Sequence, residues 1–344
     1  MRLAQESKFH AQLLLSVVAQ GSHSLSQVAS LISDAKRIVV MTGAGISVSA
    51  GIPDFRSIDG LFNNPKLKEL KLARPEQVFD LNYFRRKPEV FYSVAKQILP
   101  GLYKPTPTHH FLGLLHDHNK IHTHFTQNVD TLERLAGANP DLLMEAHGSF
   151  AKLKCIECGK EYSPRLLKEC VVDKESPEVP RCQAKRCNGA LKPSIVFYGE
   201  SLPASFTHCV KKLHDCDLLL ILGTSLKVMP FAAITQLVPP HVPRVLVNRE
   251  ATGMAFPEEY HRTRQSPKQV DSDSDSDTDG EVLGVQGLRF HLKSNKRDTF
   301  LQGDCDDVSK ALADELGWTN DLYNKLQQYD KKKTDVWDTL EGLV

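Results

Sequence analysis

The feature that most constrains the fold is a β-branched run that leads into a glycine-rich turn. The run is Ile38–Val40, and the turn is Thr42–Gly45. A strand, a glycine turn and a helix start in this order open a nucleotide-binding unit, because glycine lets backbone amides come close to a phosphate. The third glycine of the usual dinucleotide fingerprint is absent, so the turn alone does not separate a nucleotide site from an ordinary strand end.

Further short apolar runs recur along the chain with helical intervals between them. They lie at Ile121–Phe125, Leu218–Leu222 and Val245–Val247. Alternating buried strands and helices are typical of a parallel sheet that helices cover on both faces. We therefore predict an α/β fold, a Rossmann-like doubly wound parallel sheet. No apolar run approaches the roughly 18 residues of a membrane span, so we expect no membrane partner.

Helical periodicity sets the expected limits of the folded domain. It begins at Leu25, and the last clear helix is predicted over Asp306–Leu316 with a glycine after it. We expect an N-terminal tail over residues 1–24, a catalytic domain over residues 25–318 and a C-terminal tail over residues 319–344.

The charge of the chain is balanced overall but not locally. The sequence has 43 lysines and arginines against 42 aspartates and glutamates, which argues against direct binding of nucleic acid. Residues 271–281 hold a run of acids without any basic residue. We predict a disordered acidic loop over about 255–284, after which structure resumes at Leu288–Leu292. Acids flank several serines here, so a phosphoacceptor-rich regulatory loop and a plain solvated linker both remain open.

Four of the eight cysteines form two close pairs. The pairs are Cys155 with Cys158 and Cys182 with Cys187. Two short pairs at this separation can close a tetrahedral thiolate site of the zinc-ribbon kind. Four thiolates leave zinc no position for water, so the metal would be structural. We predict one zinc ion in a small inserted zinc-ribbon domain over about 153–192, which lacks apolar runs long enough for a core of its own.

A set of short motifs follows one another through the chain in a recognisable order. They are Gly43–Ser47, Gly51–Ser57, Thr126–Asp130, Glu145–Gly148, Lys192–Glu200, Gly223–Ser225 and Asn248–Glu250. Together they resemble the signature of the sirtuins, the NAD-dependent protein lysine deacylases. The resemblance runs from about Ser26 to Trp318, with the cysteine pairs correctly placed. Thr131–Arg134 and Gly303–Asp306 resemble the class I branch, and within it the cytosolic sirtuin-2 type.

The resemblance implies a reaction that consumes NAD. The acyl oxygen of an acyl-lysine attacks C1′ of the nicotinamide ribose, nicotinamide leaves, and the products are free lysine and O-acyl-ADP-ribose. The second stage needs a base that is neutral near pH 7, and His147 is the residue that matches. Neutral polar groups can orient the ribose without quenching its positive charge. We therefore expect Gln127 and Asn128 to act with His147 in catalysis.

The resemblance also implies which residues contact NAD and the substrate. The residues expected to bind NAD are Ala44, Gly45, Ile46, Ser47, Val48, Ile52, Asp54, Phe55, Arg56, Gln127, Asn128, Val129, Asp130, Gly223, Thr224, Ser225, Asn248, Arg249, Glu250 and Cys305. Of these, Ile52, Val129 and Asp130 would form the nicotinamide pocket. The residues expected to bind the acyl-lysine stem are Phe79, His147, Val196 and Phe197. The peptide itself would lie as an added strand.

Other functions remain open on the sequence alone. The same cleavage of NAD could serve a protein mono-ADP-ribosyltransferase, or the domain could be a non-catalytic NAD-responsive scaffold. Intact His147 and Asn128 argue against the scaffold. A hydride-transfer dehydrogenase is disfavoured by the missing third glycine.

The expected partners and compartment follow from the same resemblance. The partners would be acyl-lysine proteins, with histone tails and tubulin as candidates, and the chain would act as a monomer. We expect a cytoplasmic location with shuttling to the nucleus. Glu6 and the scarcity of arginine near the start of the chain argue against mitochondria.

Overall fold

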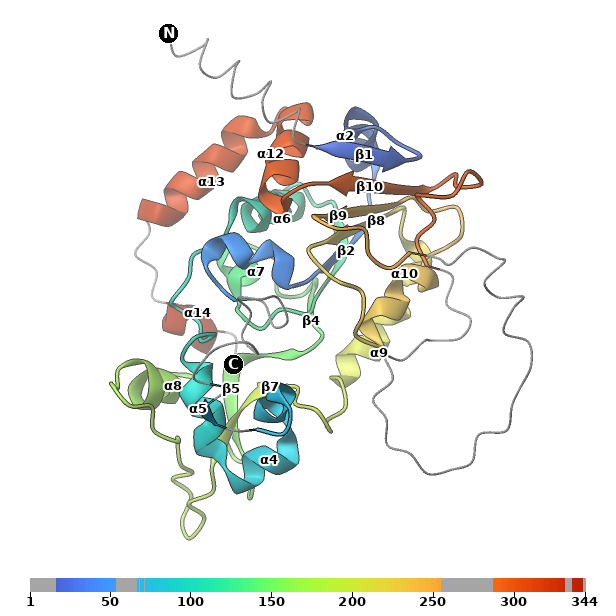
Figure 1. Cartoon of the computed structure of the whole chain (residues 1–344). Helices are drawn as coiled ribbons and strands as arrows, with labels where there is room; N and C mark the ends of the chain where they lie inside the picture. Colours follow the sequence, from blue (N-terminus) through green and yellow to red (C-terminus); the bar gives the residue numbers. More distant parts are fainter. Residues whose placement is uncertain are drawn as a thin grey trace, which may run out of the picture.

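The computed structural model describes residues 17–53, 67, 69–70, 72–254, 287–331 and 336–342. Two sheets organise this part of the chain, one of seven strands and one of three (Figure 1). The larger sheet has the order β1-β10-β9-β8-β2-β3-β4. Its strands are β1 (Val18–Gly21), β10 (Asp298–Gln302), β9 (Arg244–Asn248), β8 (Leu218–Leu222), β2 (Ile38–Thr42), β3 (Ile121–Thr126) and β4 (Leu143–Glu145).

All neighbouring strands of the larger sheet are parallel except the edge strand β1, which runs antiparallel to β10. From β4 to β10 the strand order is that of a Rossmann sheet, with β2 first in sequence and β3 and β8 on its two sides. The predicted strands at Ile38–Val40, Ile121–Phe125, Leu218–Leu222 and Val245–Val247 are confirmed as β2, β3, β8 and β9.

Helices cover both faces of the larger sheet (Figure 1). One face packs against α2 (Leu25–Asp34), α6 (Pro107–Asp117), α12 (Cys305–Glu315) and α13 (Thr319–Lys331). The other packs against α9 (Ala204–Val210), η6 (Leu213–Asp215), η7 (Phe231–Ala233) and α10 (Ile234–Leu237). Val40 faces the first layer and Val39 the second, because successive strand residues point to opposite faces. The doubly wound α/β fold is confirmed.

A smaller body stands beside the larger sheet. Its three-stranded sheet has the order β6-β5-β7. Its strands are β5 (Gly148–Cys155), β6 (Glu161–Tyr162) and β7 (Leu191–Ile195). The elements around them are η4 (Pro75–Phe79), α4 (Leu81–Arg86), α5 (Pro88–Ala95), α8 (Arg165–Leu167), η5 (Lys168–Val172) and α14 (Val336–Glu341).

The expectation that residues 153–192 have no hydrophobic core was wrong in one respect. Leu153, Leu167 and Leu191 are buried, and they pack in one cluster with side chains of α4, α5 and α14. The segment therefore shares a core that distant parts of the chain complete. Local sequence does not reveal this arrangement, because the partners lie before and after the segment.

The chain is described again from residue 287, where Leu288 forms an isolated bridge to Met254, and strand β10 begins at Asp298. One further expectation about local structure was wrong. The helix expected after Gly45 is replaced by two 3-10 turns, η1 (Ala44–Ile46) and η2 (Val48–Ala50).

The chain on either side of residues 25–318 is also structured where it is described. Strand β1 lies within residues 1–24, and α13 and α14 lie within residues 319–344. The division into a domain and two tails stays a prediction. The predicted acidic loop at about 255–284 lies outside the described residues. Among the described helices, none has the length and apolarity needed to cross a membrane.

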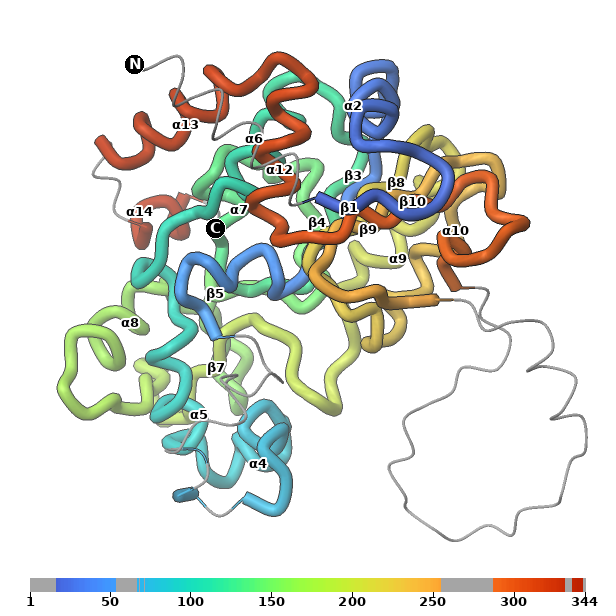
Figure 2. Tube along the Cα trace, turned by 45° about the horizontal axis from the view of Figure 1, so that its top comes forward, coloured from blue at the N-terminus to red at the C-terminus, as the bar shows by residue number. Residues whose placement is uncertain are grey.

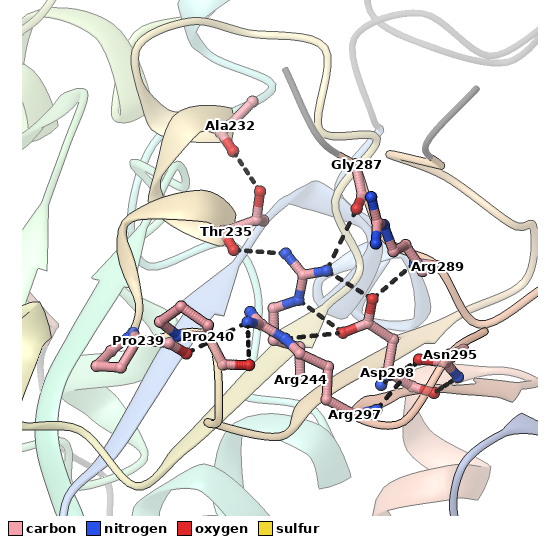
Figure 3. Close-up of polar contacts among 10 residues, drawn as sticks. All are labelled: Ala232, Thr235, Pro239, Pro240, Arg244, Gly287, Arg289, Asn295, Arg297 and Asp298. Atoms are coloured by element: carbon pink, nitrogen blue, oxygen red, sulfur yellow. Dashed lines mark hydrogen bonds and ion pairs between the residues drawn. The ribbon is translucent and has the colours of Figure 1, made fainter. Parts of the chain in front are cut away.

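A buried ion pair between Arg244 and Asp298 joins β9 to β10 (Figure 3). Arg244 Nε and Nη2 donate to the two carboxylate oxygens of Asp298 at 2.7 and 2.5 Å. The remaining Arg244 donors reach the carbonyl oxygens of Thr235 at 2.8 Å and Gly287 at 3.2 Å. Arg289 N–H also donates to Asp298, at 2.6 Å. Because both charges are paired and hydrogen-bonded, the pair is tolerated at full burial.

Candidate active site

The site lies at the carboxyl ends of β2, β3 and β8, where the strand order reverses: β3 lies on one side of β2 and β8 on the other. In open α/β sheets this switch point is where ligands bind. Gly43 N–H donates to Leu222 O at 3.1 Å, and Gly45 N–H donates to Gly223 O at 2.8 Å. A Cβ atom on Gly45 would lie 2.6 Å from Gly223 Cα, so only glycine permits this contact. The turns after β2 and β8 therefore pack backbone against backbone.

The 3-10 turns after β2 place their residues differently around this point. Ile46 and Ser47 are buried, Ala44 and Val48 are half-buried, and Gly45 is exposed. The second turn ends at Gly51, whose φ of +91° favours glycine. Ile52 follows and is half-buried. Asp54, Phe55 and Arg56 lie outside the described residues.

The loop after β3 is fastened to the other two turns by side chains. Asn128 Nδ2 donates to Gly43 O at 3.2 Å and to Ser47 Oγ at 3.3 Å. Thr224 Oγ1 donates to Gln127 Oε1 at 2.8 Å. The structure thus brings Gln127, Asn128, Ser47 and Thr224 together at one edge of the sheet. Ser225, next in the chain, is exposed.

Asp130 is a buried carboxylate in the same loop. It accepts hydrogen bonds from Ser47 Oγ at 2.7 Å and from Leu132 N–H at 3.0 Å. Burial raises the pKa of Asp130, and these two hydrogen bonds act in the opposite direction because they stabilise the charged form. Val129, beside it, is half-buried.

His147 lies between β4 and β5 with one ring nitrogen engaged. Its Nδ1 is 3.0 Å from Gln127 O. A carbonyl oxygen only accepts, so the neutral ring carries its proton on Nδ1 and leaves the Nε2 lone pair available. Burial lowers the pKa of His147 below its ordinary value. The ring is therefore neutral near pH 7 and can accept a proton at Nε2.

The residues expected around the acyl-lysine are linked to His147 through the backbone. Val196 N–H donates to His147 O at 2.8 Å, and Tyr198 N–H donates to Phe79 O at 2.8 Å. The rings of Phe79 and Phe197 meet edge to face at 5.9 Å between centroids. Val196 is therefore joined directly to His147, and both phenylalanines, on the adjoining backbone, are largely buried in the core of the smaller body.

The remaining expected NAD residues lie at the carboxyl ends of β9 and β10. Gly303 N–H donates to Asn248 O at 3.0 Å, and Asn248 Nδ2 donates to Glu250 O at 2.9 Å. Arg249 forms an exposed ion pair with Asp304. Cys305 begins α12, and burial raises the pKa of its thiol to about 12, which makes it unreactive at neutral pH.

The four paired cysteines converge in the smaller body. The Sγ atoms of Cys155, Cys158, Cys182 and Cys187 all lie within 4.8 Å of one another. The Sγ separations of Cys155 from Cys187 and of Cys158 from Cys182 are both 3.6 Å. Four sulfurs about 2.3 Å from a tetrahedral zinc ion would stand about 3.8 Å apart, so the set fits zinc.

Hydrogen bonds orient these sulfurs. Backbone N–H groups of Glu157 and Ala184 donate to the sulfurs of Cys155 and Cys182, each at 3.4 Å. The Tyr162 hydroxyl lies 3.0 Å from Cys182 Sγ. Such second contacts are typical of thiolate zinc sites.

Sequence reasoning missed a group of polar residues behind the site that join distant elements. Asp306 accepts from Ser49 Oγ, Thr108 N–H and Thr108 Oγ1 at 2.6, 3.0 and 2.6 Å, and so joins α12 to η2 and α6. His109 and Glu133, of the same group, are buried. The only available signal for His109 was its place three residues after Thr106, where a capping-box residue belongs.

Comparisons with known proteins decide the family. The model of the Sir2 family matches residues 43–230. The chain is 41% identical over 305 residues to the NAD-dependent protein deacetylase hst2 of Schizosaccharomyces pombe, covering 88% of this chain and 79% of that protein. The chain belongs to the Sir2 family. The sirtuin resemblance of its motifs is thereby confirmed.

Two other relatives support this membership of the Sir2 family. One is the NAD-dependent protein deacetylase sirtuin-2 of Danio rerio, 39% identical over 311 residues, which are 87% of this chain and 75% of that protein. The other is the NAD-dependent deacetylase sir2A of Dictyostelium discoideum, 41% identical over 303 residues. That match covers 87% of this chain but 53% of the relative's length.

Proposed function

We propose that this Sir2-family chain is an NAD-dependent protein lysine deacetylase that transfers the acyl group of acyl-lysine to ADP-ribose. The observation that carries the proposal is the hydrogen bond from His147 Nδ1 to Gln127 O, at 3.0 Å. It leaves the Nε2 lone pair of the neutral ring free to act as a base beside Gln127 and Asn128, at the switch point of a Rossmann sheet. The relatives named as NAD-dependent deacetylases support the same activity.

The first stage is the release of nicotinamide. The acyl oxygen forms a bond to C1′ of the ribose while the bond from C1′ to nicotinamide breaks, and nicotinamide leaves with the electron pair. Gln127 and Asn128, held by Thr224 and Gly43, would orient the ribose as neutral groups that do not quench its positive charge. Asp130, with Ile52 and Val129, would bind the nicotinamide carboxamide.

The second stage needs a proton acceptor. His147 Nε2 would take the proton of a ribose hydroxyl, whose oxygen then attacks the carbon of the acyl group. Resolution with water gives the free lysine amine and O-acyl-ADP-ribose. The lowered pKa of His147 keeps the ring neutral and able to take this proton at pH 7.

The other contacts to NAD follow from the positions of the turns. The turn residues 44–48 and the pair Thr224 and Ser225 would bind the diphosphate and its ribose. Asn248–Glu250 would take the adenosine ribose and Cys305 the adenine, at the carboxyl ends of β9 and β10. Phe79, Val196 and Phe197 would contact the acyl-lysine stem beside His147. The four cysteines would hold one structural zinc ion.

The proposal also covers the protein substrates and where the reaction takes place. We propose acyl-lysine proteins acted on by a cytoplasmic monomer that also enters the nucleus, with histone tails and tubulin as the first substrates to assay. The class I resemblance of Thr131–Arg134 and Gly303–Asp306 supports this choice.

The experiment that tests the function follows both products at once. The chain is incubated with NAD and a panel of acyl-lysine peptides, and nicotinamide release and deacylated peptide are quantified together. Equal amounts of the two are expected. Nicotinamide release without loss of the acyl group would instead indicate ADP-ribosyl transfer, and no NAD-dependent reaction would indicate a scaffold.

Replacement of the base tests the mechanism. His147→Ala is expected to lower turnover by about a hundredfold or more, because general-base catalysis contributes at least that factor. NAD binding measured by calorimetry and the melting temperature should stay close to those of the wild type. Near-normal turnover in this variant would show that the base is another group.

A further inference from the structure

His109 is a fully buried histidine that the proposed reaction does not use. It lies in the first turn of α6, where Thr106 is the N-cap. Thr106 Oγ1 accepts from His109 N–H at 3.4 Å, and Thr106 N–H donates back to His109 Nδ1 at 3.1 Å. This reciprocal pair is a capping box with histidine in the place of the usual glutamate or glutamine.

The capping box determines which ring nitrogen of His109 carries the proton. A backbone N–H can only donate, so Nδ1 must be the acceptor. Burial lowers the pKa of His109 to about 3, and the ring is therefore neutral at physiological pH. A neutral ring that accepts at Nδ1 carries its proton on Nε2. That nitrogen lies 3.5 Å from Ser47 Oγ.

Ser47 Oγ is then surrounded by two donors and one acceptor. His109 Nε2–H and the Asn128 amide, at 3.5 and 3.3 Å, supply hydrogens, and Asp130 Oδ2 lies at 2.7 Å. A hydroxyl has two lone pairs and one proton. With both lone pairs occupied by donors, the Ser47 proton has one place to go, which is the Asp130 carboxylate.

We infer that His109 is a positioning residue that acts through Ser47 to fix the carboxylate of Asp130 for the nicotinamide end of NAD. The inference rests on the proposed function for the role of Asp130. His109 does not reach the reacting atoms; it fills one lone pair of Ser47 and so directs the serine proton. Without that donor the hydroxyl can turn and leave Asp130 with one hydrogen bond fewer.

A metal site at the same place fits the structure less well. Ligand atoms of His109, Asp130 and Glu133 lie within 4.8 Å of one another. A metal needs an unprotonated imidazole nitrogen. Nδ1 of His109 is already an acceptor for Thr106 N–H, and Nε2 therefore carries the proton. Hydrogen bonding explains these atoms without an ion.

His109→Gln is the variant that separates positioning from folding. Glutamine at this position of a capping box can still accept from Thr106 N–H, which preserves the start of α6. It removes the ring N–H that faces Ser47. We expect the KM for NAD and the inhibition constant of nicotinamide to rise together by about fivefold, the loss typical of one neutral hydrogen bond.

Two further variants complete the experiment. Ser47→Ala removes the shared hydroxyl and should raise both constants by about tenfold or more, since its bond is to a charged group. In the Ser47→Ala background, His109→Gln should add nothing further. His110→Gln is the matched control: His110 is the next residue of α6 and packs against Tyr329, at 5.7 Å between ring centroids. It should leave both constants unchanged.

The outcomes distinguish the possible failures. Additive effects of His109→Gln and Ser47→Ala, or a lower kcat at unchanged KM, would overturn the inference and indicate a merely structural histidine. An inactive wild type would instead refute the proposed function. In that case nitrogen NMR of labelled histidine still tests the hydrogen bonds: His109 should be the neutral Nε2–H tautomer from pH 5 to pH 8, and an Nδ1–H tautomer would overturn the inference.

Discussion

At the scale of single residues, the site depends on uncharged polar groups whose hydrogens are fixed by neighbours. Burial lowers the pKa of His147 and so favours the neutral ring, while the Gln127 carbonyl oxygen acts in the opposite direction on the pKa but fixes the proton on Nδ1. Asn128 bridges Gly43 and Ser47, which lie on a different strand end. The motifs predicted which of these residues matter. They did not predict roles for His109 or Glu133. The hydrogen bonds of these buried side chains join segments that are far apart in the sequence, and a local motif does not show which segments meet.

Glu133 provides a test of this arrangement through pH. It is buried, and its Oε1 accepts from the hydroxyls of Thr126 at 2.6 Å and Thr42 at 3.3 Å. Burial, together with the nearby charge of Asp130, raises the pKa of Glu133 from 4.5 to about 8. The side chain is therefore a neutral acid in the folded protein at pH 7.

The stability that this proton contributes depends on pH in a defined direction. A raised folded-state pKa gives stability that is complete below about pH 4.5 and is lost as pH rises towards about 8. Glutamine cannot ionise. The melting temperature of Glu133→Gln minus that of the wild type should therefore increase as pH rises from 5 to 8. Glu89→Gln, at an exposed position of α5, is the control for loss of one carboxyl group from the protein. A gap between Glu133→Gln and the wild type that does not change with pH would refute the assignment.

At the scale of elements, strands with a local hydrophobic pattern were predictable and strands without one were not. β2, β8 and β9 contain apolar runs buried on both faces, and β3 is buried along most of its length although it carries His122 and His124. β10 begins with Asp298, whose charge is matched by Arg244 on the neighbouring strand. β1 is an exposed edge with the sequence VAQG. In β1 and β10, hydrogen bonding to a neighbouring strand, β10 or β9, stabilises a strand that the local sequence does not indicate.

Removal of zinc should affect the cysteine loops more than the strands beside them, because the strands belong to the core of the smaller body. The ligand loops around Cys155–Cys158 and Cys182–Cys187 should lose hydrogen-exchange protection when a chelator removes the metal. β5 and β7 should keep theirs, because Leu153 and Leu191 belong to a core cluster that side chains of α4 and α5 complete. We expect one zinc ion per chain by elemental analysis.

Variants of single cysteines test the ligand set. Cys187→Ser should lower the zinc content and reproduce the exchange pattern of the chelated protein. Cys170→Ser is the matched control, since Cys170 lies between the pairs in sequence but outside the cluster of four sulfurs. Full zinc content in Cys187→Ser, or a zinc content near zero in the fresh wild type, would contradict a four-thiolate site.

At the scale of the whole molecule, the last described helices join the two bodies. α13 packs against α6 on the larger sheet, and α14 lies between α13 and α8 in both views (Figures 1 and 2). Trp337 of α14 is 4% exposed and packs, with Val336 and Leu340, into the core of the smaller body. The C-terminal segment therefore ties the zinc-bearing part to the NAD-binding part.

Truncation of this contact predicts a stability loss. Trp337→Ala should lower the free energy of unfolding by about 3 kcal/mol or more, because it leaves a large cavity in a packed core. Tyr323→Ala on α13 is the control; its side chain is 60% exposed, so a change within about 0.5 kcal/mol is expected. Urea unfolding measures both, and equal losses would mean that α14 is not docked as described.

The ion pair between Arg244 and Asp298 has a consequence for how this protein can vary (Figure 3). Arg244 also holds Gly287 O, and Leu288 N–H donates to Gly253 O at 2.7 Å, so the chain is fastened on both sides of residues 255–286. The sheet therefore does not depend on the covalent path between the two fastened points. We expect β10 to keep its register when the number of residues between these points changes, because Arg244 and the pairing with β9 hold the strand from outside that interval.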